Sequence, residues 1–452
     1  MRQARARDTI EAMRAAAPPG QPRLGREARR LLAEATRSLL ASHTDQGVEL
    51  ERFLEIRRRQ LCLPADELAA WLRGARILVT GGTGCIGSTL TGLLAGLGPA
   101  ELVSLSRGET TVPPGQPGVD YRFADIRDRR TLDRLLTELR PDVIFHLAAQ
   151  RDPGLAETEV HRTVTTNVLG TRNVLAASVQ AGVPQVVSAS TGKALRPYSP
   201  DVYTASKRAA EWLAASAAAA HGLRVAAARF THVVDNSLIY LRLVLWARNG
   251  VMRLHAPDIS FYAQSAMESA QLLLVAGLAS RAGRFRVHAI SDLGWPICLL
   301  DVALDVLART GSATPIYFSG YGSGYEETPF PGLYDPATAG EVSPLVNALE
   351  ASQASRSACP MVDAVPVHMT PAPDAPDLLD RLADTCLRTH DPAAVRGRLD
   401  ELSWSLLYAT LGAAPAPALA RMAAQVTPHR NGLTHAHHRV LQAISACRPG
   451  LR

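Results

Sequence analysis

The sequence Thr80-Gly81-Gly82-Thr83-Gly84-Cys85-Ile86-Gly87 decides the fold, because a short apolar run over residues 77–80 precedes it and an amphipathic segment over 88–97 follows it. Glycines in this pattern between a strand and a helix are typical of a turn that binds a dinucleotide. Gly81 permits the tight turn, Gly84 lets the backbone approach a pyrophosphate, and Gly87 allows close packing of the helix on the strand. The N-terminus of that helix then faces the phosphates. We therefore expect a dinucleotide to contact Gly81, Thr83, Gly84, Cys85, Ile86 and Gly87.

Short apolar runs alternate with amphipathic segments downstream of this turn. The runs lie at residues 102–106, 121–124, 143–147, 185–190 and 224–230. Strands separated by helices indicate βαβ units and a parallel sheet. The predicted fold class is therefore α/β: a Rossmann-type doubly wound parallel sheet with a small substrate subdomain and helical N- and C-terminal extensions.

The predicted domain boundaries follow changes in composition and periodicity. Residues 1–74 are expected to form a helical N-terminal extension, since apolar residues recur there at helical spacing. Residues 75–330 are expected to form the NAD(P)-binding Rossmann domain, with the substrate subdomain over about 231–330. Residues 331–452 are expected to be loop-rich at first, where Pro, Ala and Ser are frequent, and then helical.

The ends of the predicted strands indicate which dinucleotide binds. NAD-binding proteins usually have an acidic residue after the second strand, which bonds the ribose 2′-hydroxyl. Here Ser106 and Arg107 stand in that place, and an arginine beside a small hydroxyl suits a 2′-phosphate. We therefore expect NADP, with NAD as the alternative. The other expected cofactor contacts end the third and fourth strands: Asp125, Ile126, Leu147, Ala148 and Ala149.

The 48 basic residues include only two lysines, Lys193 and Lys207. A lysine that survives in an arginine-rich chain is expected where an amine is required, because arginine cannot deprotonate; chance survival is the alternative. Lys207 ends Tyr203-Thr204-Ala205-Ser206-Lys207, in which Tyr and Lys lie on one side of a helix. We expect the phenol to relay a proton during hydride transfer, with a pKa lowered by the ammonium and by the positive ring of the cofactor. Tyr203 and Lys207 are thus also expected to contact the cofactor.

Two more polar residues are expected at the same site. Thr191 follows the predicted strand 185–190, where its hydroxyl can bond the reacting oxygen. Asn167 lies in Thr166-Asn167-Val168-Leu169-Gly170-Thr171, which is expected to be a helical segment packed beside the site.

Over roughly residues 76–330 the sequence resembles the extended short-chain dehydrogenases, and more narrowly the soluble nucleotide-sugar 4,6-dehydratases of the polysaccharide-biosynthesis (CapD-like) group. The motifs that carry the resemblance are TGGTGCIG at 80–87, SRGE at 106–109, HLAAQR at 146–151, TNVLGTRNV at 166–174, STGKA at 190–194 and YTASK at 203–207. The resemblance implies that the cofactor oxidises a sugar at C4 and that a lysine, which falls on Lys193, removes the C5 proton. It further implies that an aspartate protonates the departing C6 hydroxyl and that hydride returns to C6. The resemblance adds Lys193 to Thr191, Tyr203, Lys207 and Asn167 as the expected catalytic set.

The sequence departs from this family pattern at the proton donor. The aspartate would precede Lys193, where the chain has Gly192, and glycine cannot donate a proton. Elimination would therefore need another acid, such as Asp152, Asp201 or water. Without one, deprotonation at C5 would lead to epimerisation.

A second departure concerns the nucleotide diphosphate. The basic stretch that grips it in the family falls on residues 320–327, which contain Glu326 and Glu327 and no cation. Arg229 and Arg242 could compensate. Otherwise a sugar attached to a natural product, or a cationic aminosugar, suits an acidic pocket better.

The predicted function is that of an NADP-dependent sugar-modifying enzyme acting through a transient keto-sugar, as a dehydratase or epimerase of a nucleotide sugar or sugar-containing natural product. An NADP-dependent alcohol dehydrogenase or ketoreductase is one alternative. A non-catalytic cofactor-binding scaffold is the alternative of another class.

The composition of the chain indicates which binding partners and which cellular location to expect. A net charge of +6 in 452 residues is mild, so no nucleic-acid partner is expected. No membrane association is expected either, because no apolar run approaches the roughly 20 residues of a membrane span, and without a signal-peptide pattern the chain is expected to be cytoplasmic. The cysteines form no CxxC pair, and His429, His435, His437 and His438 are expected to be helical surface residues, so no metal site is predicted. A homo-oligomer is expected from the resemblance, through the two helices that flank the sheet.

Overall fold

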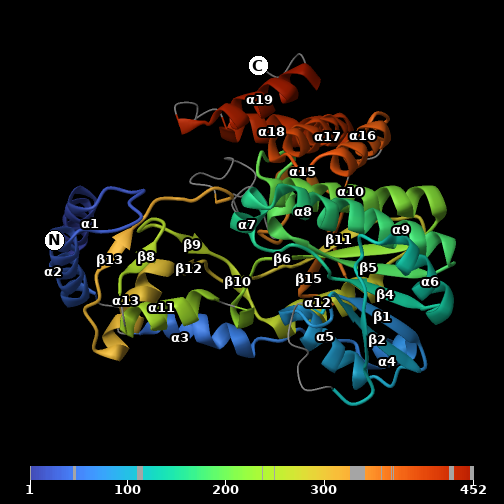
Figure 1. Ribbon diagram of the computed structural model, residues 1–452, viewed down its shortest axis with the longest axis horizontal. Coiled ribbons are helices and arrows are strands. Elements are labelled where there is room, and N and C mark those ends of the chain that lie inside the picture. Colours follow the sequence, from blue (N-terminus) through green and yellow to red (C-terminus); the bar gives the residue numbers. More distant parts are fainter. Residues whose placement is uncertain are drawn as a thin grey trace. The chain divides into compact units, whose positions relative to one another are not determined.

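The computed structural model describes residues 2–43, 47–108, 116–236, 238–248, 250–325, 342–357, 359–367, 369, 371–426 and 432–447. The chain forms two compact units (Figure 1). Unit 1 comprises Met1–Arg59, His232–Ala266 and Leu293–Glu327, and unit 2 comprises Gln60–Thr231, Met267–Asp292 and Thr328–Arg452. These units divide the chain differently from the predicted domains, because the N-terminal helices share a core with the later segments of unit 1.

Unit 2 is built around a nine-stranded sheet in the order β14-β15-β11-β6-β5-β4-β1-β2-β3. Neighbouring strands from β3 to β11 are parallel, whereas β15 runs antiparallel to β11 and β14 antiparallel to β15. This confirms the predicted fold class, and each predicted strand lies within one residue of its observed bounds. The strands are β1 (Arg76–Thr80), β2 (Glu101–Ser106), β3 (Asp120–Phe123), β4 (Val143–His146), β5 (Gln185–Thr191), β6 (Arg224–Phe230), β11 (Arg286–Ile290), β14 (Ser355–Arg356) and β15 (Val362–Pro366).

Helices cover both faces of this sheet, which explains why its central strands are almost continuously apolar. Figure 1 shows α6, α9 and α10 on one face and α4, α5 and α12 on the other. The C-terminal helix α17 packs against α10 and α8. The helices of unit 2 are α4 (Ala65–Leu72), α5 (Cys85–Ala95), α6 (Arg129–Leu139), α7 (Pro153–Thr158), α8 (Val160–Val164), η2 (Thr165–Gly170), α9 (Thr171–Gln180), η3 (Gly192–Leu195), α10 (Val202–His221), α12 (Ala266–Ala279), α15 (Ala348–Ala351), α16 (Ala375–Arg388), α17 (Pro392–Ala413), α18 (Ala416–Val426) and α19 (His435–Cys447).

Unit 1 has its own apolar core, to which the N-terminal helices and the later segments both contribute. The buried Asp305 carboxylate accepts hydrogen bonds from the backbone N–H groups of Gly47 and Leu50, at 2.9 and 3.1 Å, and so fixes the start of α3. The elements are α1 (Arg2–Ala16), α2 (Arg26–Ser42), α3 (Val48–Glu55), η1 (Ile56–Arg58), β7 (His232–Val233), η4 (Val234–Asn236), α11 (Leu238–Arg248), β8 (Met252–Leu254), β9 (Ser260–Phe261), β10 (Ala263–Gln264), β12 (Ile297–Cys298), α13 (Leu299–Thr310) and β13 (Ile316–Phe318).

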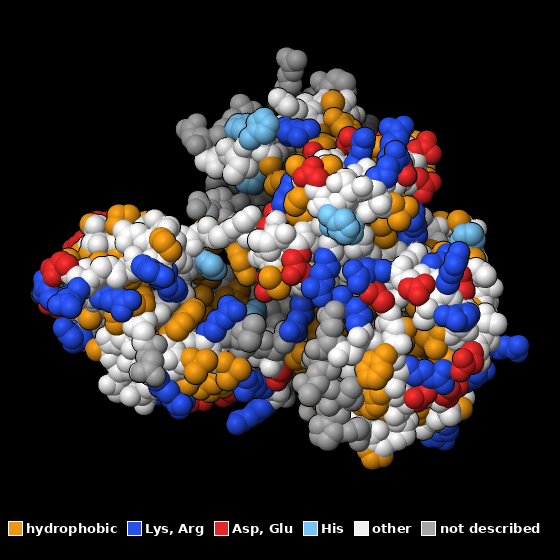
Figure 2. All heavy atoms as spheres, viewed as in Figure 1, with side chains coloured by type: hydrophobic (Ala, Val, Ile, Leu, Met, Phe, Trp, Pro, Cys, Tyr) orange, Lys and Arg blue, Asp and Glu red, His pale blue; other side chains and the backbone are white. Residues whose placement is uncertain are grey.

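Charged side chains at the β2–β3 edge pair with one another. Arg122 lies 2.7 Å from both Asp120 and Glu138, and Arg76 lies 3.3 Å from Glu101. On the face drawn in Figure 2, acidic and basic side chains accordingly lie side by side around β2. Among the described helices, none is both long and apolar enough to cross a bilayer.

Candidate active site

The glycine turn joins β1 to α5, as predicted, and its backbone requires glycine at two positions. Gly81 has a φ of +74°, and a Cβ there would lie 2.7 Å from the backbone nitrogen of Ala148. A Cβ at Gly87 would lie 2.2 Å from the carbonyl oxygen of Gly81. Helix α5 can therefore start close behind β1, with Gly84 as its N-cap. This arrangement gives the turn the shape of a pyrophosphate cradle.

The other predicted cofactor contacts lie at the same edge of the sheet. Ser106 ends β2 and Arg107 follows it, and residues 147–149 follow β4, on either side of the turn after β1. The strand order reverses between β1 and β4, which is where open α/β sheets bind ligands. Arg107 is exposed. These residues together could hold a dinucleotide.

Asp125 and Ile126 follow β3 in different environments. Ile126 is buried, and a Cβ at Gly170 would lie 2.7 Å from its Cδ1 atom. The Asp125 carboxylate lies 2.5 Å from the Arg127 guanidinium. Burial raises the pKa of Asp125, but hydrogen bonds from Arg127 and the charge of Arg107 outweigh it, so the net shift is downward. Asp125 therefore remains ionised beside Arg107.

Thr191 and Tyr203 are brought together from the end of β5 and the first turn of α10. A hydrogen bond from Thr191 to the Tyr203 hydroxyl lowers the pKa of this tyrosine, but burial outweighs it and raises the pKa to about 12. Lys207 Nζ donates to the Ala189 carbonyl at 2.7 Å. Burial lowers the pKa of Lys207 itself to about 8, against the opposing effect of Glu211.

Asn167 lies in η2, a π-helical turn, and both ends of its amide are used to hold the backbone. Its Oδ1 accepts from the Gln150 N–H at 2.7 Å, and its Nδ2 donates to the Gln150 carbonyl and to Ser206 Oγ, both at 3.0 Å. Ser206 Oγ in turn donates to the Tyr203 carbonyl at 2.8 Å. Asn167 is therefore a positioning residue, which ties the loop after β4 to the helix that carries Tyr203.

The buried His146 belongs to this arrangement and was not predicted as a site residue. Its Nδ1 lies 2.8 Å from Thr80 Oγ1 and its Nε2 lies 3.0 Å from Thr171 Oγ1. Because Thr171 Oγ1 donates to the Asn167 carbonyl, Nε2 carries the proton and Nδ1 accepts from Thr80. Burial lowers the pKa of His146 to about 3, with a contribution from Lys207. A histidine in an otherwise apolar strand was the available signal, since buried polar groups need partners.

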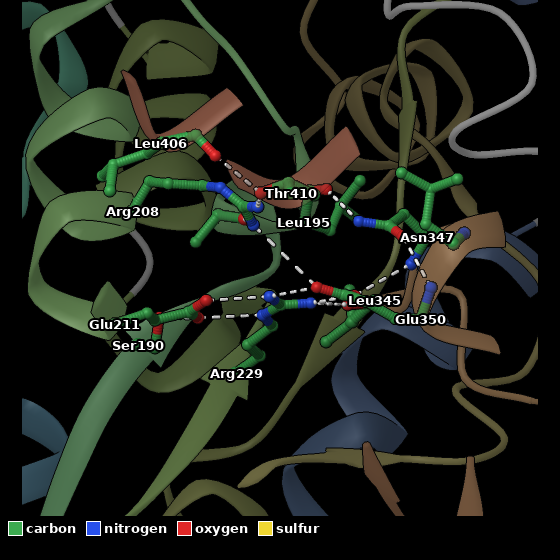
Figure 3. A network of polar contacts seen from close by, with 12 residues as sticks. Ser190, Leu195, Arg208, Glu211, Arg229, Leu345, Asn347, Glu350, Leu406 and Thr410 are labelled. Atoms are coloured by element: carbon green, nitrogen blue, oxygen red, sulfur yellow. Dashed lines mark hydrogen bonds and ion pairs between the residues drawn. The ribbon is translucent and has the colours of Figure 1, made fainter. Parts of the chain in front are cut away.

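Arg229 lies on β6, and its surroundings differ from those expected from the sequence. Arg229 was expected as a possible partner of a diphosphate, but it is fully buried and binds two carboxylates (Figure 3). Its guanidinium lies 2.9 and 2.8 Å from the oxygens of Glu211, and 2.6 and 2.9 Å from those of Glu350. Ser190 Oγ also donates to Glu211, at 2.6 Å.

The segment 190–195, which carries Thr191 and Lys193, is held through its backbone as well. Arg208 donates to the Ala194 carbonyl at 2.9 Å, and Asn347 Nδ2 donates to the Leu195 carbonyl at 2.6 Å. The backbone N–H of Lys193 donates to Thr191 Oγ1 at 3.3 Å. Sequence reasoning missed Arg208 and Asn347, because each acts on residues that are distant along the chain.

The other residues named in the sequence analysis do not join this group of side chains. Asp152 and Asp201 cap helices α7 and α10 by accepting from Leu155 N and Thr204 N, at 3.0 and 2.7 Å. Arg242 is exposed on α11 in unit 1. Across the described ranges, no cluster of three metal-ligating side chains occurs. The residues Glu109, Glu326, Glu327 and His429 lie outside the described residues.

Solved structures of other proteins have a similar fold, and two of them serve as examples. The X-ray structure of Pen from Bacillus thuringiensis has a TM-score of 0.55 and 21% identity, and the match covers 65% of this chain and 90% of that chain. The epimerase Mth375 from Methanothermobacter thermautotrophicus has a TM-score of 0.51 and 21% identity, with coverage of 61% and 86%. At this identity the likeness concerns the fold alone.

Sequence comparison finds relatives in polysaccharide biosynthesis. The probable polysaccharide biosynthesis protein EpsC of Bacillus subtilis is 27% identical over 60% of this chain and 47% of its own length. The capsular polysaccharide biosynthesis protein CapD of Staphylococcus aureus is 27% identical over 57% and 45%. A UDP-N-acetylglucosamine 4,6-dehydratase (inverting) of Campylobacter jejuni is 32% identical over 30% and 42%. This chain thus spans about half the length of these curated relatives.

The family model described as "Polysaccharide biosynthesis protein" matches residues 77–325. This match contains the glycine turn, Thr191, Lys193, Tyr203 and Lys207, and it confirms the resemblance noted in the sequence. Because it covers more than half of the 452 residues, the chain belongs to the polysaccharide biosynthesis protein family.

Proposed function

We propose that this chain is an enzyme that modifies the hexose of a nucleotide sugar through a transient keto-sugar, as a dehydratase or an epimerase. The observation that carries the proposal is the placement of Thr191 at the end of β5 and of Tyr203 at the start of α10, where the Thr191 side chain is close enough to lower the pKa of the Tyr203 hydroxyl. Two hydroxyl groups held together there suit a sugar hydroxyl whose carbon is being oxidised. The match to a UDP-N-acetylglucosamine 4,6-dehydratase supports a nucleotide sugar as substrate. A sugar attached to a natural product remains the second substrate class.

NADP is the proposed cofactor, with NAD as the alternative. Arg107 is exposed after β2, and the acidic residue typical of NAD-binding proteins does not stand there. When bound, the nicotinamide ring supplies the acceptor and donor of hydride. Residues Gly81, Thr83, Gly84, Cys85, Ile86 and Gly87 would hold the pyrophosphate, Ser106 and Arg107 the 2′-phosphate, and Asp125, Ile126, Leu147, Ala148 and Ala149 the adenosine side.

In the proposed reaction, Tyr203 and Lys193 each transfer a proton and Thr191 assists Tyr203. Tyr203 Oη takes the proton of the sugar C4 hydroxyl, and Thr191 Oγ1 bonds the same oxygen. Lys193 Nζ removes the proton at C5, which is acidic once C4 is a ketone. Lys207, whose pKa of about 8 leaves it protonated in large part at neutral pH, orients the nicotinamide ribose.

Incubation of the purified protein with UDP-N-acetylglucosamine and NADP in D2O tests the proposal. Mass spectrometry of the sugar is expected to detect solvent deuterium, while the cofactor shows no net reduction. Net production of NADPH would indicate an alcohol dehydrogenase or ketoreductase instead. Full exchange by Lys193→Ala and Tyr203→Phe variants would exclude the roles assigned to both residues.

A homo-oligomer is part of the proposal, and its interface is constrained by the C-terminal region. Helix α17 packs against α8 and α10, two helices that flank the sheet. The Arg396 guanidinium of α17 lies 2.7 Å from Glu157, and Tyr198 donates to Asp400 at 2.7 Å. An interface through α8 and α10 would have to displace α17 from these two helices. Light scattering during size-exclusion chromatography gives the number of subunits.

A further inference from the structure

Gly192 follows Thr191 in η3 and is buried against the C-terminal region. A Cβ at this glycine would lie 2.7 Å from Leu345 Cδ2, and 3.5 Å from both Leu345 Cγ and the Phe230 carbonyl oxygen. A separation below 3 Å between carbon atoms is well inside their van der Waals contact distance. The direction in which a side chain at position 192 would leave the backbone is therefore filled by Leu345.

Both the backbone N–H and the backbone carbonyl of Leu345 form hydrogen bonds. Its N–H donates to Ser343 Oγ at 3.2 Å, and the Ser343 N–H donates to the Asp363 carboxylate at 2.7 Å. Its carbonyl accepts from Arg229 at 3.2 Å, inside the buried network with Glu211 and Glu350 (Figure 3). Its side chain is only 5% exposed. The backbone of Leu345 is thus held by the buried network, and its side chain is packed in the interior beside Gly192.

The carboxylates that surround this segment are already engaged. Asp152 and Asp201, the two expected substitutes for the acid, cap helices α7 and α10. Glu211 and Glu350 both bind Arg229. Loss of a hydroxyl from a sugar needs a proton for the departing oxygen. Gly192 carries no donor, Leu345 fills the space where a side chain at position 192 would begin, and these four carboxylates have other partners.

We infer that Leu345 determines the outcome of the reaction, because it fills the space in which a side chain at position 192, where the resemblance places the proton donor for loss of water, would lie. The inference rests on the proposed function. The C6–O bond stays intact, a proton that Lys193 takes from C5 is replaced at C5 by a solvent proton, and the carbon oxidised at C4 is reduced again at C4. The product then has the composition of the substrate, as an epimer. Leu345 lies beyond the family-matched residues 77–325, so the C-terminal region supplies this specificity.

The first test asks whether Leu345 occupies the space beside Gly192, and it needs no substrate. It compares the effect of Gly192→Ala on thermal unfolding in the native background and in the Leu345→Ala background. In the native background the added methyl group is expected to lower the Tm by at least about 3 °C, since overpacking is destabilising. In the Leu345→Ala background the same change is expected to have little effect. Equal losses in both backgrounds would overturn the assignment of this space to Leu345.

The second test measures the product with a panel of UDP- and dTDP-hexoses in D2O, analysed by mass spectrometry. The native chain is expected to introduce deuterium without losing the mass of a water molecule. The double variant Gly192→Asp/Leu345→Ala is expected to release water, and the matched control Gly192→Asp alone is not. Loss of water by the native chain, or none by the double variant, would overturn the inference and leave the proposed function intact. Failure of every hexose to exchange hydrogen would instead refute the proposed function.

Discussion

Thr191, the last residue of β5, lies close enough to the hydroxyl of Tyr203, at the start of α10, for its side chain to act on the pKa of this phenol. This contact lowers the pKa of a phenol that burial raises to about 12. The first two predictions concern these two side chains.

Replacement Thr191→Val is expected to move the pH profile of the exchange reaction to higher pH. The ionised phenol is the base, so the rate rises with pH towards the pKa of Tyr203, and loss of the donor raises that pKa further. The measurement is the initial rate of deuterium incorporation between pH 6 and 10. Thr204→Val is the matched control, because the Thr204 hydroxyl is buried nearby without a hydrogen-bond partner among the described residues. An unshifted profile in Thr191→Val would contradict the assigned contact.

Replacement Tyr203→Phe is expected to lower the rate of exchange by roughly 10²–10⁴-fold, the usual contribution of a positioned acid–base group. The affinity for NADP is expected to change little, because the phenol acts on the sugar. Kinetics and isothermal titration calorimetry separate the two effects. A variant that kept its rate would favour the scaffold interpretation.

Replacement Arg107→Ala is expected to weaken NADP binding by about 10- to 100-fold, as expected for one lost charge-assisted hydrogen bond, and to leave NAD binding unchanged. Titration calorimetry with both dinucleotides measures the difference. Arg130→Ala on α6 is the control, since Arg130 is an exposed arginine of the same unit. Equal losses for NADP and NAD would argue against a 2′-phosphate contact.

Unfolding free energy is expected to fall as the pH drops from 6.5 to 3, because His146 has a folded pKa of about 3 and an unfolded value near 6.5. The unfolded chain binds the proton first, so the stability is present above pH 6.5 and is lost below it. At pH 4 the loss from this group is on the order of 3 kcal/mol. Urea denaturation at several pH values measures it. His146→Gln is expected to flatten the dependence, whereas the same change at the exposed His221 is not.

Replacement Glu350→Ala is expected to destabilise the chain by about 3–5 kcal/mol, because it leaves the buried Arg229 charge with only one carboxylate. Chemical denaturation gives this value. Glu401→Ala, which breaks an exposed pair with Arg398, is the control and is expected to cost at most about 1 kcal/mol. Similar losses in the two variants would mean that burial of the Arg229 network adds no stability.

The sequence predicted the six strands from β1 to β6 to within one residue, because all of them except the edge strand β3 are short apolar runs that are buried in the sheet. It also placed Thr191 and Tyr203 correctly at strand and helix ends. It could not reveal that Arg229 is buried, since an arginine in a strand looks the same whether it faces a ligand or two carboxylates. Leu345 and Glu350 were equally hidden, because their partners lie more than a hundred residues away.

In unit 1 the sequence likewise predicted the helices of residues 1–59 but not the residues against which they pack. Their amphipathic spacing predicted helices but not the surface that they cover. That surface comes from segments 232–266 and 293–327, which follow the whole first half of the sheet. Periodicity identifies an apolar face, and only the fold identifies its partner.

The Arg229–Glu350 ion pair also has a consequence for synthesis of the chain. The two residues are 121 positions apart, so at ordinary translation rates β6 leaves the ribosome about 6–24 s before its second carboxylate is made. During that interval a strand at the centre of the sheet carries a guanidinium with half of its counter-charge. A polypeptide ending at residue 325, where the family match stops, would remain in that state permanently. The nascent Rossmann sheet is therefore expected to mature late, and to need protection from aggregation until the C-terminal region emerges.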